Sequence, residues 1–96
     1  MFFRRKKKDK QKGDSCYGAL DTTRELLPEE LADDIEQLMN RHGEYEASID
    51  MLIDALTEQD VRINQRQFGA LAEALTMLED LDQEERLFLL EELLDE

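Results

Sequence analysis

The sequence predicts an all-α protein, a compact bundle of four to five short helices with a disordered basic arm at the N-terminus. Three observations lead to this fold class. The 96 residues include only four glycines and one proline, so helix-breaking residues are few. Leucine-rich segments repeat their apolar residues at helical spacing. Cap-forming residues, namely Gly43, Asn64 and Asp82, separate these segments by short connections, which favours sequential packing of neighbouring helices.

The charge of the chain is strongly asymmetric along its length. The net charge is −13, yet residues 1–20 carry seven basic and two acidic side chains. The remaining 76 residues carry five basic and 23 acidic side chains. An acidic body of this kind repels nucleic acid through its own field and attracts basic proteins. We therefore expect a basic protein partner and no direct nucleic-acid binding by the body.

Residues 1–15, MFFRRKKKDKQKGDS, are almost entirely polar after Phe3. They offer too little apolar surface to offset the entropy of ordering, so we expect a disordered basic arm followed by a single helical domain over residues 16–96. Two aromatic residues beside a basic cluster are also typical of a contact with a membrane surface or with phosphates. A tail that only adds solubility is the alternative with no binding role.

The segment 16–27 is ambiguous, with Asp21 or Thr22 as a candidate start of a short helix. From Pro28 onward the pattern is clearer, because proline suits the first turn of a helix and the next two residues are acidic. The apolar side of this helix consists of Leu31, Ile35, Leu38 and Met39. Gly43 is suited to a left-handed cap at its end.

An acidic helix is predicted from about Glu44 to Glu58. Its apolar stripe consists of Tyr45, Ile49, Leu52, Ile53 and Leu56. Its acidic face consists of Glu46, Asp50, Asp54 and Glu58, with Glu44 and Asp60 at the two ends. Like charges four residues apart repel by roughly 0.2–0.5 kcal/mol per pair, and no Lys or Arg lies between Arg41 and Arg62 to offset this. The face is either simply solvated or complementary to a basic partner.

The C-terminal third predicts two further helices. Val61 and Ile63 alternate with polar residues, so we expect an extended connector that places Ile63 in the core. Asn64 with Gln67, and Asp82 with Glu85, have the spacing of capping boxes. The core residues expected in these helices are Phe68, Leu71, Leu75, Leu78, Leu87, Leu90 and Leu94. Phe88 and Leu89 exceed what one stripe can bury, which leaves the oligomeric state open.

The sequence gives little indication of catalysis, so we expect a protein that is not an enzyme and that binds no cofactor. His42 is the only histidine and Cys16 the only cysteine, so a zinc site lacks ligands. No segment has the length and apolarity of a membrane span or a signal peptide. A single cysteine fits a reducing compartment, and we expect a cytoplasmic protein.

A set of residues at fixed spacing resembles the MafI-type immunity proteins, small helical proteins encoded beside polymorphic or contact-dependent bacterial toxins. The matching residues are His42, Gly43, Glu44, Tyr45, Leu52, Asp54, Leu56, Glu58, Ile63, Phe68 and Leu71, and the resemblance covers roughly residues 26–78. It implies an immunity protein that binds and neutralises its cognate toxin in the cytoplasm. Such toxins are often nucleases, whose basic surface would be complementary to the acidic helix.

The six acidic residues Glu44, Glu46, Asp50, Asp54, Glu58 and Asp60 are therefore the predicted partner-binding site. The alternative is a non-enzymatic helical adaptor whose basic arm contacts membrane or RNA. The two hypotheses differ in where the function lies, because an adaptor depends on residues 1–15 and an inhibitor on the acidic body.

Overall fold

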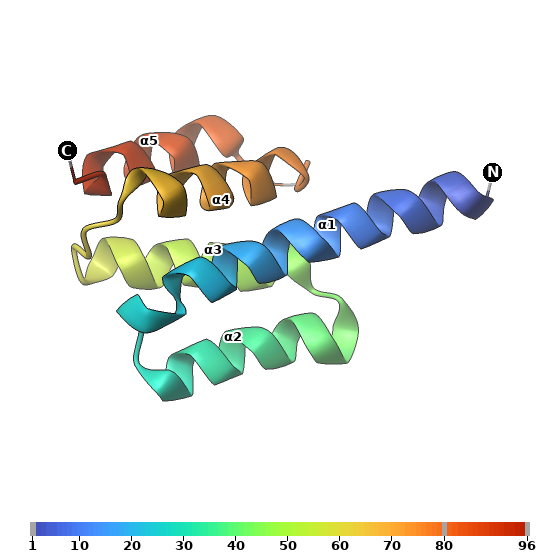
Figure 1. The fold of residues 1–96 in the computed structure, drawn as a ribbon, viewed down its shortest axis with the longest axis horizontal. Helices are drawn as coiled ribbons and strands as arrows, with labels where there is room; N and C mark the ends of the chain where they lie inside the picture. Colours follow the sequence, from blue (N-terminus) through green and yellow to red (C-terminus); the bar gives the residue numbers. More distant parts are fainter. Residues whose placement is uncertain (1, 80, 96) are drawn as a thin grey trace.

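Helices make up nearly all of the ordered elements in the computed structural model, which describes residues 2–79 and 81–95 and, within them, all side chains except those of residues 2–9 and His42. The elements are α1 (Phe2–Thr23), a 3-10 turn η1 (Arg24–Leu26), α2 (Glu29–His42), α3 (Tyr45–Glu58), α4 (Gln65–Thr76) and α5 (Gln83–Leu93) (Figure 1). The predicted all-α bundle of short helices is confirmed.

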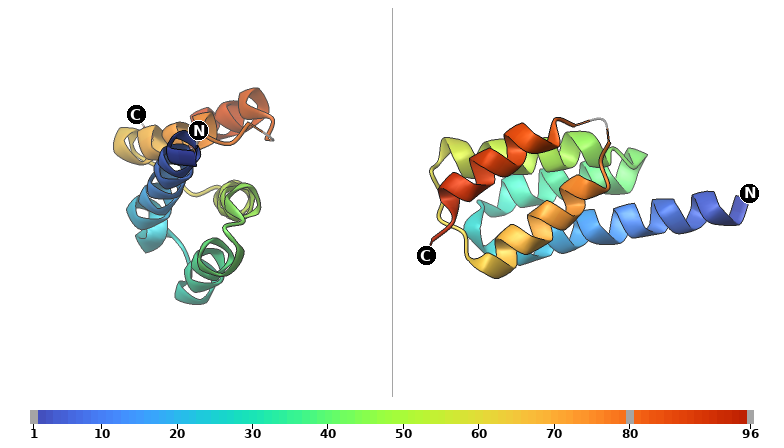
Figure 2. Two further views of the ribbon diagram at one scale, coloured as in Figure 1. Left: turned by 90° about the vertical axis from the view of Figure 1, so that its right-hand side faces the viewer. Right: turned by 90° about the horizontal axis from the view of Figure 1, so that it is seen from above.

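Helix α1 is the longest element and was not predicted as a helix. Its 22 residues span about 33 Å. The C-terminal half packs against α4 and also contacts α2 and α3. The N-terminal turns project beyond the ends of the other helices, as two views show (Figures 1 and 2).

The structure differs here from the disordered arm expected over residues 1–15 and from the short helix expected to begin at Asp21 or Thr22. Helix α1 is continuous through both positions, and Gly13 is already buried within it. The physical reason is a row of mostly small side chains that fits close against neighbouring helices. The row is buried over its whole length and comprises Gly13, Cys16, Ala19, Leu20 and Thr23. Residue 1 of the expected arm lies outside the described residues.

Tyr45, the first residue of α3, fixes how α1 meets the turn between α2 and α3. A Cβ atom on Gly13 would lie only 3.0 Å from the Tyr45 hydroxyl oxygen, so the glycine permits this approach. The rings of Tyr17 and Tyr45 meet edge to face with centroids 6.5 Å apart. The Tyr17 hydroxyl donates a hydrogen bond to the side-chain oxygen of Asn40 on α2.

Helix α2 begins and ends as its sequence predicts. Pro28 precedes the first helical residue, and Gly43 follows the last with φ of 59°, in the left-handed region. The amide of Gly43 donates to the carbonyl of Met39 at 3.1 Å, which satisfies one of the free carbonyl groups at the helix end. Ile35 and Met39 are buried in the core.

The acidic helix and its connector are also confirmed. Four of the five predicted stripe residues, Ile49, Leu52, Ile53 and Leu56, are almost fully buried, and Tyr45 is half-buried. Ile63 is 1% exposed and forms an isolated parallel bridge with Leu94. Its amide donates to Leu93 at 3.0 Å, and its carbonyl accepts from Asp95 at 2.8 Å. The connector thus holds the end of α5.

The two predicted capping boxes differ in outcome. Around Asn64 and Gln67 both hydrogen bonds form, at 2.8 and 2.9 Å, and the Gln67 amide also donates to the Thr22 carbonyl at 3.1 Å. At the start of α5 the Asp82 carboxylate accepts from the Glu85 amide at 3.2 Å, and no reciprocal bond forms in the described chain.

The core face of α5 differs slightly from prediction. Leu90 and Leu93 are the buried residues of this helix, whereas Leu87 and Leu94 are only half-buried. Phe88 is 61% exposed, on the side of α5 away from the core.

Two glycines should respond oppositely to substitution by alanine. Gly43→Ala should lower the free energy of unfolding by about 1 kcal/mol, because a Cβ atom is disfavoured at its positive φ. Gly69→Ala should raise it by roughly 0.5–1 kcal/mol, because Gly69 lies within α4 and no atom within 4 Å would meet the added Cβ atom. Urea unfolding followed by circular dichroism measures both. Equal effects of the same sign would contradict the assigned backbone conformations.

Candidate partner-binding surface

The six acidic residues predicted as a partner-binding site do lie along α3, but they are not equivalent. Glu44, Asp54, Glu58 and Asp60 are exposed, whereas Glu46 and Asp50 are half-buried. Helix α3 has 14 residues and is about 21 Å long, so Glu44 and Asp60 flank the surface from opposite ends. A single partner side chain therefore contacts only part of the set.

Glu46 has an intramolecular cation supplied by α1. The ammonium group of Lys12 lies 3.8 Å from the Glu46 carboxylate, and both side chains are about one-third exposed. At this distance and exposure the ion pair is weak, yet it offsets part of the repulsion along the acidic face. Lys12 belongs to the segment expected to be disordered, so this ion pair could not be predicted from the sequence.

Asp50 has a stronger partner on α5. The Arg86 guanidinium donates two hydrogen bonds to one Asp50 oxygen, from Nη2 at 2.7 Å and from Nε at 3.0 Å. The Arg86 side chain is 20% exposed and that of Asp50 39% exposed. This ion pair joins α3 to α5. It also partly neutralises Asp50, so this carboxylate is less available to a basic partner than one that makes no ion pair.

Asp54 and Glu58 keep no ion pair with any residue that the structure describes. They lie four residues apart on the exposed side of α3, where their mutual repulsion is not compensated. Met51, three residues before Asp54, is 38% exposed on the same side. This combination of free carboxylates and an exposed apolar side chain is the outer face of α3.

The outer face of α3 continues into a groove shared with α2. The groove has a volume of about 320 Å³ and is lined by Asp34, Gln37, Leu38, Arg41 and Met51. Leu38 and Met51 give it an apolar part, while Asp34 and Arg41 place one charge of each sign at its sides. Met51 was not among the predicted site residues, because that prediction was based only on the acidic residues on this side of the helix. Its signal was a single apolar residue within a polar face.

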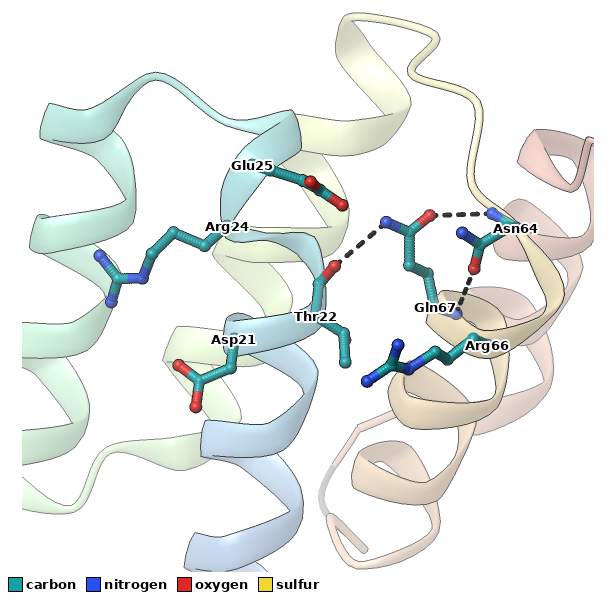
Figure 3. A pocket seen from close by; sticks show the side chains of 7 residues that line it. All are labelled: Asp21, Thr22, Arg24, Glu25, Asn64, Arg66 and Gln67. Carbon is teal, nitrogen blue, oxygen red and sulfur yellow. Dashed lines mark hydrogen bonds between the residues drawn. The ribbon is translucent and has the colours of Figure 1, made fainter.

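A larger hollow of about 530 Å³ lies between the end of α1 and the start of α4 (Figure 3). Several of its polar groups already have partners within the fold. Arg24 points away from it and donates to Asp33 at 3.3 Å and to Glu36 at 2.5 Å, and its hydrogen bond to the Glu36 carboxylate raises the Arg24 pKa above its ordinary value. Gln67 bonds to Asn64 and to the Thr22 carbonyl. We assign no chemistry to this hollow.

Cys16 is fully buried at the α1 interface. Burial raises the pKa of its thiol to about 12, the negative charge of Glu46 adds to this, and Lys12 opposes it. The thiol is therefore protonated and inaccessible near neutral pH, which makes it a poor nucleophile. In the described part of the chain, no three His, Cys, Asp or Glu side chains converge in a way that could hold a metal ion.

Comparisons of the chain with protein-family models, with curated proteins and with solved structures give no match. Among the described helices, none has both the length and the apolarity needed to cross a membrane.

The Asp50–Arg86 ion pair should contribute measurably to stability. A double-mutant cycle with Asp50→Asn and Arg86→Gln should give a coupling free energy of about 0.5–1 kcal/mol, because the pair is only partly exposed. Urea unfolding at low and high salt measures it, and the coupling should fall as salt screens the charges. A coupling of zero at low salt would contradict the geometry.

Proposed function

We propose that this protein is an immunity protein, a non-enzymatic inhibitor that binds a basic cognate toxin through the outer face of α3. The observation that carries the proposal is that Asp54 and Glu58 make no ion pair with any residue that the structure describes and lie on the same side of α3 as the exposed Met51. A basic partner would offset the repulsion between the two carboxylates. The resemblance to MafI-type immunity proteins supports a toxin as that partner, and the proposed place of action is the cytoplasm.

The charge of the chain supports the choice of a basic partner. A net charge of −13 attracts a cationic surface over distances beyond direct contact and so speeds encounter. A nuclease presents such a surface because it must bind phosphates. Carboxylates that occupy phosphate-binding groups would exclude the substrate, which is sufficient for inhibition and needs no chemistry from the inhibitor. The proposed toxin is therefore a nuclease.

Charge alone mainly sets the rate and specificity of encounter, so tight inhibition needs an apolar anchor. Met51 supplies a candidate, since its flexible side chain borders the α2–α3 groove beside Leu38. The proposed site therefore differs from the acidic set predicted by sequence. Asp54, Glu58 and Met51 contact the partner, while Glu46 and Asp50 are held by Lys12 and Arg86.

The direct test uses the polypeptide encoded beside the gene for this chain. It is produced alone and together with this protein, and cell growth and nuclease activity are measured. We expect toxicity alone and rescue by co-production. A neighbour that is neither toxic nor bound by this protein would refute the immunity function.

Charge reversal should show whether the outer face of α3, rather than the net charge of the protein, speeds association with the toxin. Asp54→Lys with Glu58→Lys should slow association with the toxin by at least about tenfold and abolish protection. Asp14→Lys with Glu73→Lys is the matched control, because these residues are exposed on α1 and α4 and the change in net charge is the same. Equal loss in both variants would show that net charge, and not the outer face of α3, is responsible.

Met51→Ala should act on dissociation. Loss of an apolar anchor typically weakens binding by more than about 1 kcal/mol, or roughly fivefold in affinity. Surface plasmon resonance should show faster release of the toxin with an almost unchanged association rate. An unchanged release rate would place the anchor elsewhere.

A further inference from the structure

The outer face of α5 combines an exposed aromatic side chain with acidic residues. Phe88 is 61% exposed at its centre, although an aromatic side chain of this size is normally buried. Residues three and four positions away lie beside it on the helix. All four are exposed glutamates, namely Glu84, Glu85, Glu91 and Glu92.

Within the described part of the chain, no basic side chain neutralises the glutamates of this face. None of the four glutamates makes an ion pair there. Arg86, the one cation on α5, is turned toward Asp50 on α3. Arg62 approaches from the connector, but its guanidinium donates to the backbone carbonyl of Glu92 at 3.0 Å. The outer face of α5 thus combines an exposed aromatic ring with uncompensated negative charge.

The same molecule carries the complementary element at its other end. Residues 4–10 include six basic residues and one acidic residue, Asp9. Their backbone forms the N-terminal turns of α1, which project beyond the bundle (Figures 1 and 2). The buried half of α1 is packed against α4, so these turns cannot fold back onto α5 of the same copy without breaking the helix.

We propose that the basic N-terminal turns of α1 dock on the outer face of α5 in a second copy of this chain, with Phe88 at the centre of the contact. The glutamates around Phe88 bind the Arg and Lys side chains of the incoming helix. Phe88 supplies apolar area against their aliphatic stems. Each copy offers one basic helix and one acidic face, so the contact is head-to-tail and generates a ring or an open chain of copies.

Electrostatics decides between this contact and the repulsion of two acidic bodies. At physiological ionic strength the screening length is about 8 Å, so the repulsion between distant charges is largely screened. Opposite charges that touch within the interface are screened much less. Self-association should therefore persist at moderate salt and weaken at high salt. The contact uses residues distinct from Asp54, Glu58 and Met51, so it does not rest on the proposed toxin binding.

The test is sedimentation velocity on the full chain over a concentration series, at about 50 and about 500 mM NaCl. The parent should form assemblies larger than the monomer at low salt and dissociate at high salt. Phe88→Ala should raise the dissociation constant at least about tenfold, and it should fold normally because Phe88 is exposed. Asp54→Lys with Glu58→Lys changes the net charge as much as Glu84→Lys with Glu91→Lys does; it is the control for net charge and should assemble like the parent.

Two further variants test the pairing itself. A face variant carries Glu84→Lys and Glu91→Lys, and an arm variant carries Lys6→Glu, Lys7→Glu and Lys10→Glu. Each should be monomeric alone, while an equimolar mixture should associate because the unchanged arm of the face variant fits the unchanged face of the arm variant. A parent that is monomeric at low salt, an arm variant that assembles like the parent, or a mixture that stays monomeric would each overturn the proposal. A monomeric parent that binds RNA or anionic vesicles through residues 4–10 would overturn it as well.

Discussion

The buried face of α1 is the constraint on which the rest of the structure depends. Cys16, Ala19, Leu20 and Thr23 are fully buried, and three of these four side chains are small. Small side chains allow the neighbouring helices to approach closely, so α4 packs along α1 and Tyr45 of α3 lies against Gly13. Because this packing fixes the direction of α1, it brings Lys12 beside Glu46 and sends the basic N-terminal turns away from the bundle.

The helices that could be predicted are those whose sequence patterns and caps act between residues close together in the chain. Helices α2 to α5 carry large apolar residues at helical spacing and caps such as Gly43 and Asn64, which act within a few residues. Helix α1 has the same spacing at positions 16, 19, 20 and 23, but Cys, Ala and Thr are weak indicators of a buried stripe. The charged residues before them pointed to disorder. The sequence shows the pattern only when small residues are counted as core residues.

The candidate site shows the same limit. The six acidic residues lie on or beside one helix as predicted, because that placement follows from their spacing alone. The spacing could not show which carboxylates are free, because the cations that bind Glu46 and Asp50 come from distant parts of the chain, Lys12 and Arg86. Met51 was missed for another reason. One exposed apolar residue leaves no periodic pattern, and its importance depends on the groove that α2 forms beside it.

The distribution of these ion pairs explains how so acidic a chain remains folded. Cations are placed where acidic helices meet their neighbours, as with Arg86 between α5 and α3 and Arg24 beside α2. Where helices pack against one another water is partly excluded, so a charge without an ion-pair partner would lower the stability of the fold. Asp54, Glu58 and the four glutamates around Phe88 make no ion pair within the described residues, and they lie on outer faces, where water screens them and repulsion costs only a few tenths of a kcal/mol per pair. The acidic residues that join the helices are therefore different from those on the outer faces, which is what the proposed binding of a basic partner by the outer faces requires.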